Sequence, residues 1–115
     1  MENRMLQVTD KLLQEVTNLI VQETKPRKII LFGSHARGTA HPDSDLDFLI
    51  VEDGPFDTKR SRRAEIARLS NALFDYLIPM DFLVFTPQEI EKWKGVKNHV
   101  VAHALREGKT LYESH

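Results

Sequence analysis

Residues 31–51, LFGSHARGTAHPDSDLDFLIV, decide how the rest of the chain is interpreted. An apolar run ends at the Gly33-Ser34 turn, and a second apolar run opens with Asp45 and Asp47, with Arg37 between the two. A strand that ends in glycine and starts a helix presents backbone N–H groups, which bind phosphate oxygens. Carboxylates at alternate strand positions point to the same face. The stretch therefore predicts a phosphate-binding turn that faces a metal-binding strand.

Length and composition predict one small domain over residues 1–115. The 41% hydrophobic and 29% charged residues are ordinary for a soluble globular protein. No apolar run approaches the length of a membrane helix, and no secretory leader is evident, so we expect a cytoplasmic protein without a membrane partner. Cysteine is absent, which excludes disulfides, thiolate metal sites and cysteine nucleophiles.

The charge balance bears on the partners of the protein. The formal net charge is -1, from 16 basic and 17 acidic residues. Proteins that bind nucleic acid usually carry an excess of basic residues or a basic face. The balance therefore argues against nucleic acid as an obligatory partner, while a small anionic substrate needs only a local site.

The elements around this stretch follow from periodicity and from proline and glycine positions. Apolar residues three and four apart predict a helix over 3–23, and β-rich runs predict strands within 27–32, 45–51 and 80–85. A second helix is predicted over 57–77. Thr86-Pro87 is a helix-start signal and predicts a last helical stretch from there onward. We expect this stretch to break near Gly95, to resume over 98–107 and to end at a Gly108 cap. This order predicts an α+β fold, a small mixed sheet flanked by helices.

A third acid extends the candidate site. Asp81 begins the strand predicted over 80–85, where a carboxylate is unusual for a purely structural strand. One such Asp is more often a solvated strand-end residue, and a lone Gly-Ser is an ordinary turn. Three acids at strand starts, beside the Gly33-Ser34 turn, instead favour a divalent cation site, because magnesium prefers carboxylate oxygens together with substrate phosphates.

The combined pattern resembles a known superfamily. It is similar to that of the nucleotidyltransferases typified by DNA polymerase β and kanamycin nucleotidyltransferase. In this chain, Gly33-Ser34 is followed by ten residues, then by Asp45-x-Asp47, and later by Asp81 on another predicted strand. The segments GSHARG at 33–38, PDSDLD at 42–47 and ALREGKTLYE at 104–113 are similar to the minimal nucleotidyltransferases of prokaryotes. The resemblance covers nearly the whole chain and implies the palm-like, polymerase β-type fold.

The resemblance also implies roles for individual residues. Asp45 and Asp47 would bind two Mg²⁺ ions, and Asp81 would hold the metal that activates the acceptor hydroxyl. Gly33 and Ser34 would bind the β- and γ-phosphates of a nucleoside triphosphate, and Arg37 would add a phosphate contact. Such a site displaces pyrophosphate in line at the α-phosphate.

The resemblance further implies a partner. Minimal members are similar to antitoxins that transfer AMP from ATP onto a tyrosine of a HEPN-type ribonuclease toxin. Two alternatives stay open: an antitoxin that acts by binding alone, and a nucleotidyltransferase for an RNA end or a small molecule. No residue pattern decides the nucleotide preference or the oligomeric state, whether monomer, homo-oligomer or hetero-oligomer.

Two weaker signals are interpreted as unrelated to the site. The basic cluster at 59–63, KRSRR, is expected to be a solvated helix face. His35 lies inside the motif but fills a variable position, so we interpret it as a bystander.

Overall fold

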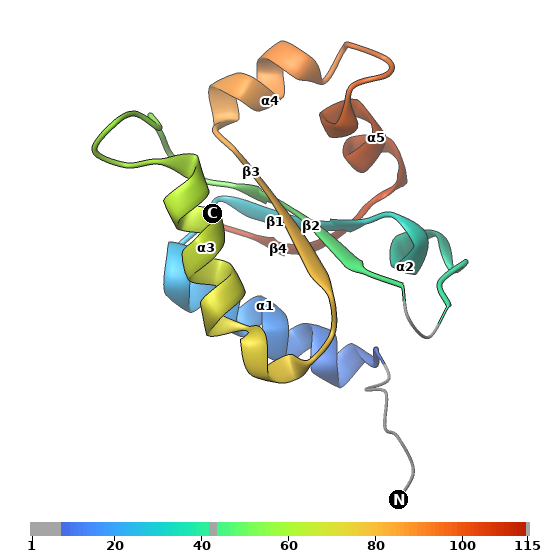
Figure 1. The fold of residues 1–115 in the computed structure, drawn as a ribbon. Helices are drawn as coiled ribbons and strands as arrows, with labels where there is room; N and C mark the ends of the chain where they lie inside the picture. Colours follow the sequence, from blue (N-terminus) through green and yellow to red (C-terminus); the bar gives the residue numbers. More distant parts are fainter. Residues whose placement is uncertain (1–7, 42–43, 115) are drawn as a thin grey trace, which may run out of the picture.

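The computed structural model describes residues 8–41 and 44–114. Its elements are α1 (Asp10–Thr24), β1 (Lys28–Phe32), α2 (Ser34–Arg37), β2 (Leu46–Val51), α3 (Arg62–Ala72), the 3₁₀ helix η1 (Phe74–Tyr76), β3 (Met80–Phe85), α4 (Pro87–Trp93), α5 (Val100–Glu107) and β4 (Lys109–Glu113) (Figure 1). The start of the predicted first helix and residues 42–43 of the motif lie outside the described residues.

The centre of the fold is a four-stranded mixed sheet in the order β3-β2-β1-β4. β1 runs antiparallel to both β2 and β4, whereas β2 and β3 are parallel. A parallel pair needs a crossover connection, and α3 supplies it between β2 and β3. The expected α+β class, a small mixed sheet flanked by helices, is confirmed.

Helices cover the two faces of the sheet unequally. Leu46, Phe48 and Ile50 of β2 pack with α1 and α3 in the larger buried cluster. Leu49 points the other way and packs with Ala104 of α5 and with Ile90 of α4 (Figure 1). This is the alternation predicted for the strand, because successive side chains point to opposite faces.

Three local predictions are confirmed at helix ends. The Thr86 hydroxyl and the Glu89 side chain form a reciprocal capping box with Pro87 in the first turn of α4. The helical stretch breaks between Trp93 and Val100, and Gly108 caps α5 by donating its N–H to the Ala104 carbonyl at 2.9 Å.

Other boundaries differ from the predictions. α3 begins at Arg62 rather than 57, because the Asp57 carboxylate accepts the backbone N–H groups of Lys59 (2.9 Å) and Arg60 (3.0 Å) and holds a turn there. The short helix α2 and the edge strand β4 were not placed by sequence periodicity. β4 exists because Lys109–Glu113 pair with β1.

The basic cluster at 59–63 is not simply a solvated face. The Arg60 guanidinium donates to the Glu52 carboxylate at 2.9 Å. The Arg62 guanidinium makes two bonds to the Glu89 carboxylate, at 2.9 and 2.7 Å, and one to the Val84 carbonyl at 2.7 Å. These two arginines therefore tie α3 and its N-terminal turn to the sheet and to α4.

Among residues 8–41 and 44–114, no helix has the length and apolar character that a membrane crossing demands.

Candidate functional site

Two of the predicted acids lie side by side on the sheet. Asp47 of β2 is the register partner of Asp81 of β3 in the parallel pair, and it faces Phe32 of β1 on its other side. Register partners on adjacent strands project to the same face of a sheet. Both carboxylates therefore stand on the face that α4 and α5 cover farther along the strands, at the end where both parallel strands begin.

Asp45 extends this acidic row outside the sheet. It lies one residue before β2 and is exposed, two positions from Asp47. Partial burial, and then the negative charges of Asp81 and Asp45, raise the pKa of Asp47 above its ordinary value, whereas His35 and Arg37 oppose this shift. Asp81 and Asp45 are thus both close enough to Asp47 to act on its charge.

The acids do not form a closed cage. Within residues 8–41 and 44–114, no three Asp, Glu or His side chains are arranged to hold a metal ion by themselves. Asp47 and Asp81 are the pair that strand register brings together, while the backbone around Asp45 belongs to the loop that enters β2.

The Gly33-Ser34 turn packs directly on this pair. Gly33 has φ +77° and ψ −157°, a combination that is open essentially to glycine alone. A Cβ built on Gly33 would overlap the Asp47 carboxylate and would lie 3.2 Å from its Cγ. The Gly33 carbonyl accepts the N–H groups of Ala36 and Arg37, each at 3.1 Å, and so starts α2 at this point. The predicted phosphate turn and the predicted metal strand are therefore in contact.

His35 has a contact that the sequence does not reveal. Its Nε2–H donates to the Ser44 carbonyl at 3.3 Å, which joins α2 to the residue just before Asp45. The interpretation as a bystander is therefore incomplete. No sequence pattern marks this contact, because it depends on how the loop between α2 and β2 folds back.

Arg37 is paired with a residue of α5. Its Nη1 lies 3.2 Å from Glu107 Oε1, so the guanidinium forms an ion pair with the last turn of α5. The positive charge of Arg37 nevertheless opposes the rise in the pKa of Asp47. Of the other residues predicted for the site, Gly33 packs on Asp47 and Asp81 is its register partner. Asp45 and Arg37 act on Asp47 through their charges, and Ser34 follows Gly33 as the first residue of α2.

Comparison with known proteins places this geometry in a family. Residues 10–106 match the family model described as "Nucleotidyltransferase domain". The chain is 32% identical over 108 residues to "Putative protein adenylyltransferase MJ0604" of Methanocaldococcus jannaschii, covering 90% of this chain and 97% of that protein.

Solved structures share the fold. A toxin–antitoxin structure with AMP-PNP superposes with a TM-score of 0.56 at 21% identity, over 88% of this chain and 73% of that one. The MntA-HepT toxin–antitoxin structure gives a TM-score of 0.51 at 17% identity, over 91% and 74% of the two chains. At these identities the likeness concerns the fold. Together with the family match and the 32% identical relative, it shows that the chain belongs to the nucleotidyltransferase domain family, within the polymerase β-like fold.

Proposed function

We propose that this protein transfers AMP from ATP, in a Mg²⁺-dependent reaction, onto a tyrosine of a HEPN-type ribonuclease toxin and acts as its antitoxin. The observation that carries the proposal is the contact of the Gly33 turn with Asp47, which stands in register with Asp81. The relative named for protein adenylyl transfer supports the protein acceptor. The toxin–antitoxin structures of the same fold, one of them with AMP-PNP, support the toxin partner and the nucleotide.

The residues fit a divalent cation and a triphosphate. The donor set of Asp45, Asp47 and Asp81 consists of carboxylate oxygens only, the ligands that Mg²⁺ prefers. Gly33 lacks the side chain that would block close approach of a phosphate to the backbone beside Asp47. Two bound Mg²⁺ ions would supply charge neutralisation at the reacting phosphate oxygens.

The protein's own residues have distinct tasks in this proposal. Gly33 and Ser34 hold the β- and γ-phosphates, by the turn's backbone and the serine hydroxyl. Asp81, on the edge strand β3, stands nearest to an acceptor that approaches from outside the sheet. Its carboxylate receives the proton of the acceptor hydroxyl as the new phosphate ester forms and pyrophosphate leaves.

The experiment uses ATP labelled either on the α-phosphate or on the γ-phosphate. The protein is incubated with each, with Mg²⁺ or EDTA, and with a HEPN-type toxin encoded beside it. We expect α-label on the toxin with Mg²⁺ only. Label from the γ-phosphate would show phosphoryl transfer and contradict the proposal.

The Asp45→Asn/Asp47→Asn double variant separates catalysis from binding. If it leaves the toxin unlabelled and active, AMP transfer is the silencing event. If it leaves the toxin unlabelled and still fully inhibited, the protein is an antitoxin that works by contact alone. If the wild-type protein labels an RNA end or an aminoglycoside rather than the toxin, the acceptor assignment is wrong.

A further inference from the structure

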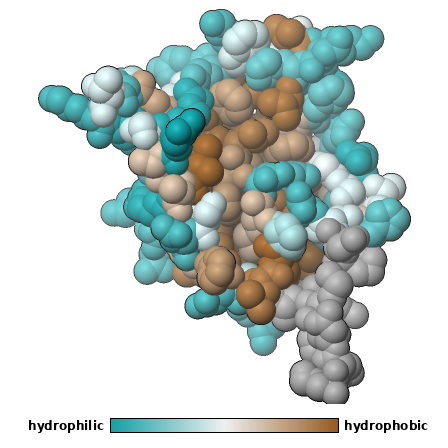
Figure 2. Space-filling view, in the orientation of Figure 1, coloured by the Kyte–Doolittle hydropathy of each residue, from teal (hydrophilic) through white to brown (hydrophobic). Residues whose placement is uncertain are grey.

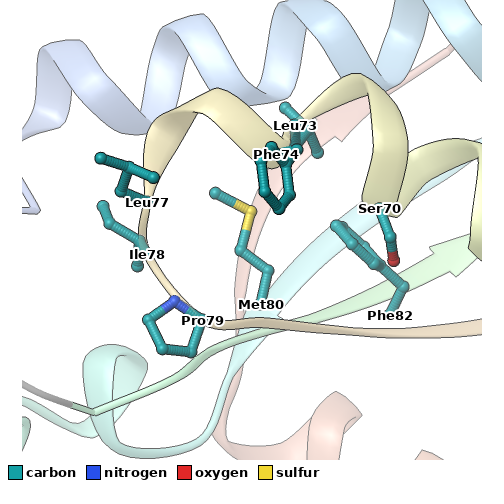
Figure 3. A pocket seen from close by; sticks show the side chains of 8 residues that line it. All are labelled: Ser70, Leu73, Phe74, Leu77, Ile78, Pro79, Met80 and Phe82. Carbon is teal, nitrogen blue, oxygen red and sulfur yellow. The ribbon is translucent and has the colours of Figure 1, made fainter.

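An apolar hollow lies beside the start of β3, on the side of the sheet opposite the carboxylates. Its volume is about 340 Å³, and Leu73, Phe74, Leu77, Met80 and Phe82 form much of its lining. Figure 3 shows Met80 and Phe82 reaching from the strand toward the helical segment, which carries Leu73, Phe74 and Leu77. The hollow is large enough to seat apolar side chains of another molecule.

Phe74 and Leu77 are much more exposed than other large apolar residues in the part of the chain that the structure describes. Phe74 is 73% and Leu77 79% exposed, compared with 45% for Val96 and 37% for Leu105. Apolar residues spread over the same face of the molecule, around β3 (Figure 2). Contiguous exposed apolar surface marks interaction sites.

Leu77 is held in an unfavourable backbone conformation. Its φ is +58°, in the left-handed region, and its N–H donates to the Phe74 carbonyl at 3.3 Å. This conformation is uncommon for non-glycine residues, and glycine or asparagine adopts it more readily. The fold thus presents a large apolar side chain at a position where a smaller or polar residue would fit the backbone better.

The hollow lies next to the candidate site but does not overlap it. Met80 and Phe82 flank Asp81 in the sequence, and their side chains point to the opposite face of the strand. β3 is an edge strand of the sheet. A nucleotide on the Asp47–Asp81 face therefore does not fill the hollow, whereas a molecule that wraps around the edge can reach both faces.

The charged residues near the hollow indicate which kind of segment would bind there. Residues 70–85 contain the two acids Asp75 and Asp81 and no lysine, arginine or histidine. Arg68, one turn earlier on α3, is already paired with Glu65 at 2.8 Å and lies 3.7 Å from Glu23. Of the two acids, Asp81 points to the opposite face of β3, whereas Asp75 is exposed in η1, between Phe74 and Leu77 in the sequence. An apolar hollow beside an exposed acid complements a segment that combines apolar anchors with a basic residue.

We propose that the Phe74–Leu77 hollow is the docking surface for the acceptor protein. The bound segment inserts apolar side chains into the hollow, places Lys or Arg against Asp75, and brings its acceptor hydroxyl around the edge of β3 to Asp81. This inference rests on the proposed transfer to a protein acceptor and adds the chemistry by which that acceptor is recognised.

The test uses two synthetic helical peptides, each with one tyrosine as its sole hydroxyl. The first carries leucines on one face and Lys and Arg beside the tyrosine; the second has Glu in place of every basic residue. Binding to the full chain is followed by backbone amide chemical shifts. We expect the basic peptide to bind and to shift the amides of residues 73–82, with no binding of the acidic peptide.

The variant set is Phe74→Gln with Leu77→Asn, because asparagine tolerates a positive φ and keeps the turn. Val96→Gln is the matched control, an exposed apolar residue between α4 and α5. Loss of apolar anchors at the centre of a contact should weaken binding of the basic peptide by about tenfold or more. The control variant should bind as the wild type does.

The outcomes separate this inference from the proposed function. Failure of the basic peptide to bind, equal binding of both peptides, or shifts confined to other residues would overturn the docking surface. Self-association of the wild type, lost in the double variant, would assign the hollow to a second copy and also overturn it. AMP transfer from α-labelled ATP is scored separately. A peptide that binds at the hollow without being labelled counts against the proposed function and leaves the docking surface standing.

Discussion

The backbone of Gly33 lies so close to the carboxylate of Asp47 that no side chain fits between them. This contact joins the turn after β1 to the acid on β2, which are far apart in the sequence. The turn and the carboxylate are therefore packed against each other, and a substitution at Gly33 acts on Asp47 directly.

Gly33→Ala should abolish nucleotidyl transfer while leaving a folded protein. The added methyl group displaces the Asp47 carboxylate, and the positive φ adds a backbone cost of about 1–2 kcal/mol. Transfer from α-labelled ATP and urea unfolding measure the two effects. Gly38→Ala is the control, because Gly38 also has a positive φ (+78°) but its Cβ would have no neighbour within 4 Å. Similar losses of activity in both variants would contradict a specific role for the Gly33–Asp47 contact.

His35→Phe should weaken the binding of Mg²⁺ without destabilising the fold. Phenylalanine keeps a ring but loses the Nε2–H that bonds the Ser44 carbonyl. The loop before Asp45 is then less restrained, so we expect the Mg²⁺ concentration for half-maximal activity to rise. His35→Gln, which retains a donor, should restore part of the difference. An unchanged Mg²⁺ dependence in the phenylalanine variant would return His35 to the role of a bystander.

Much of the fold could be predicted from sequence because its elements carry local signals. The strands at 45–51 and 80–85 are short, β-rich apolar runs, and Thr86-Pro87 marks a helix start that a capping box confirms. The bounds of α2 and the whole of β4 escaped prediction for a physical reason. A four-residue helix has no periodicity to detect, and β4 is specified by its pairing with β1 rather than by its own pattern.

The candidate site, like the fold, could be predicted from the sequence only in part. The residue types and spacing of Gly33, Ser34, Asp45 and Asp47 are visible in the sequence, and Asp81 is visible as an acid that opens a strand. Its register with Asp47 is a property of the β2–β3 pairing. The ion pair of Arg37 with Glu107 depends on where α5 ends, which no local pattern specifies.

A second acid pair gives the protein a pH dependence unrelated to the site. Glu52, at the far end of β2 from Asp47, is 1% exposed, and its Oε2 has no hydrogen-bond donor among the described residues. Burial and the neighbouring Glu65 raise the pKa of Glu52 to about 8, against the opposing charge of Arg60. Burial alone would raise the pKa of Glu65, but its interactions with the Glu52 carboxyl group and with the Arg68 guanidinium outweigh burial and lower that pKa. One proton on Glu52 therefore lets the two carboxyl groups share a hydrogen bond.

Stability should consequently fall as the pH rises toward 8. The folded state keeps the Glu52 proton up to a pKa of about 8, whereas unfolded Glu releases it near its ordinary value of 4.5. Between these values the folded state binds more protons, so each pH unit costs up to about 1.4 kcal/mol of unfolding free energy. Urea unfolding from about pH 5 to about pH 9, which covers this window and the plateau above it, measures the decline.

Glu52→Gln is the matched variant for that measurement. The amide donates a hydrogen bond to Glu65 without titrating, so we expect the decline toward pH 8 to be largely removed. Asp53→Asn, at an exposed acid paired with Arg27, should keep the decline. A wild-type stability that is flat or rises over this pH range would show that Glu52 is not protonated in the folded protein.

In the proposed function, Asp47 and Asp81, joined by strand register, perform nucleotidyl transfer. The most direct measurement is the rate of α-label transfer from ATP to the acceptor by Asp47→Asn and Asp81→Asn, with Asp53→Asn as the control. We predict that each site variant loses at least about 100-fold in rate with unchanged urea unfolding, and that the control keeps the wild-type rate. An Asp81→Asn protein that transfers AMP at the wild-type rate would contradict the claim.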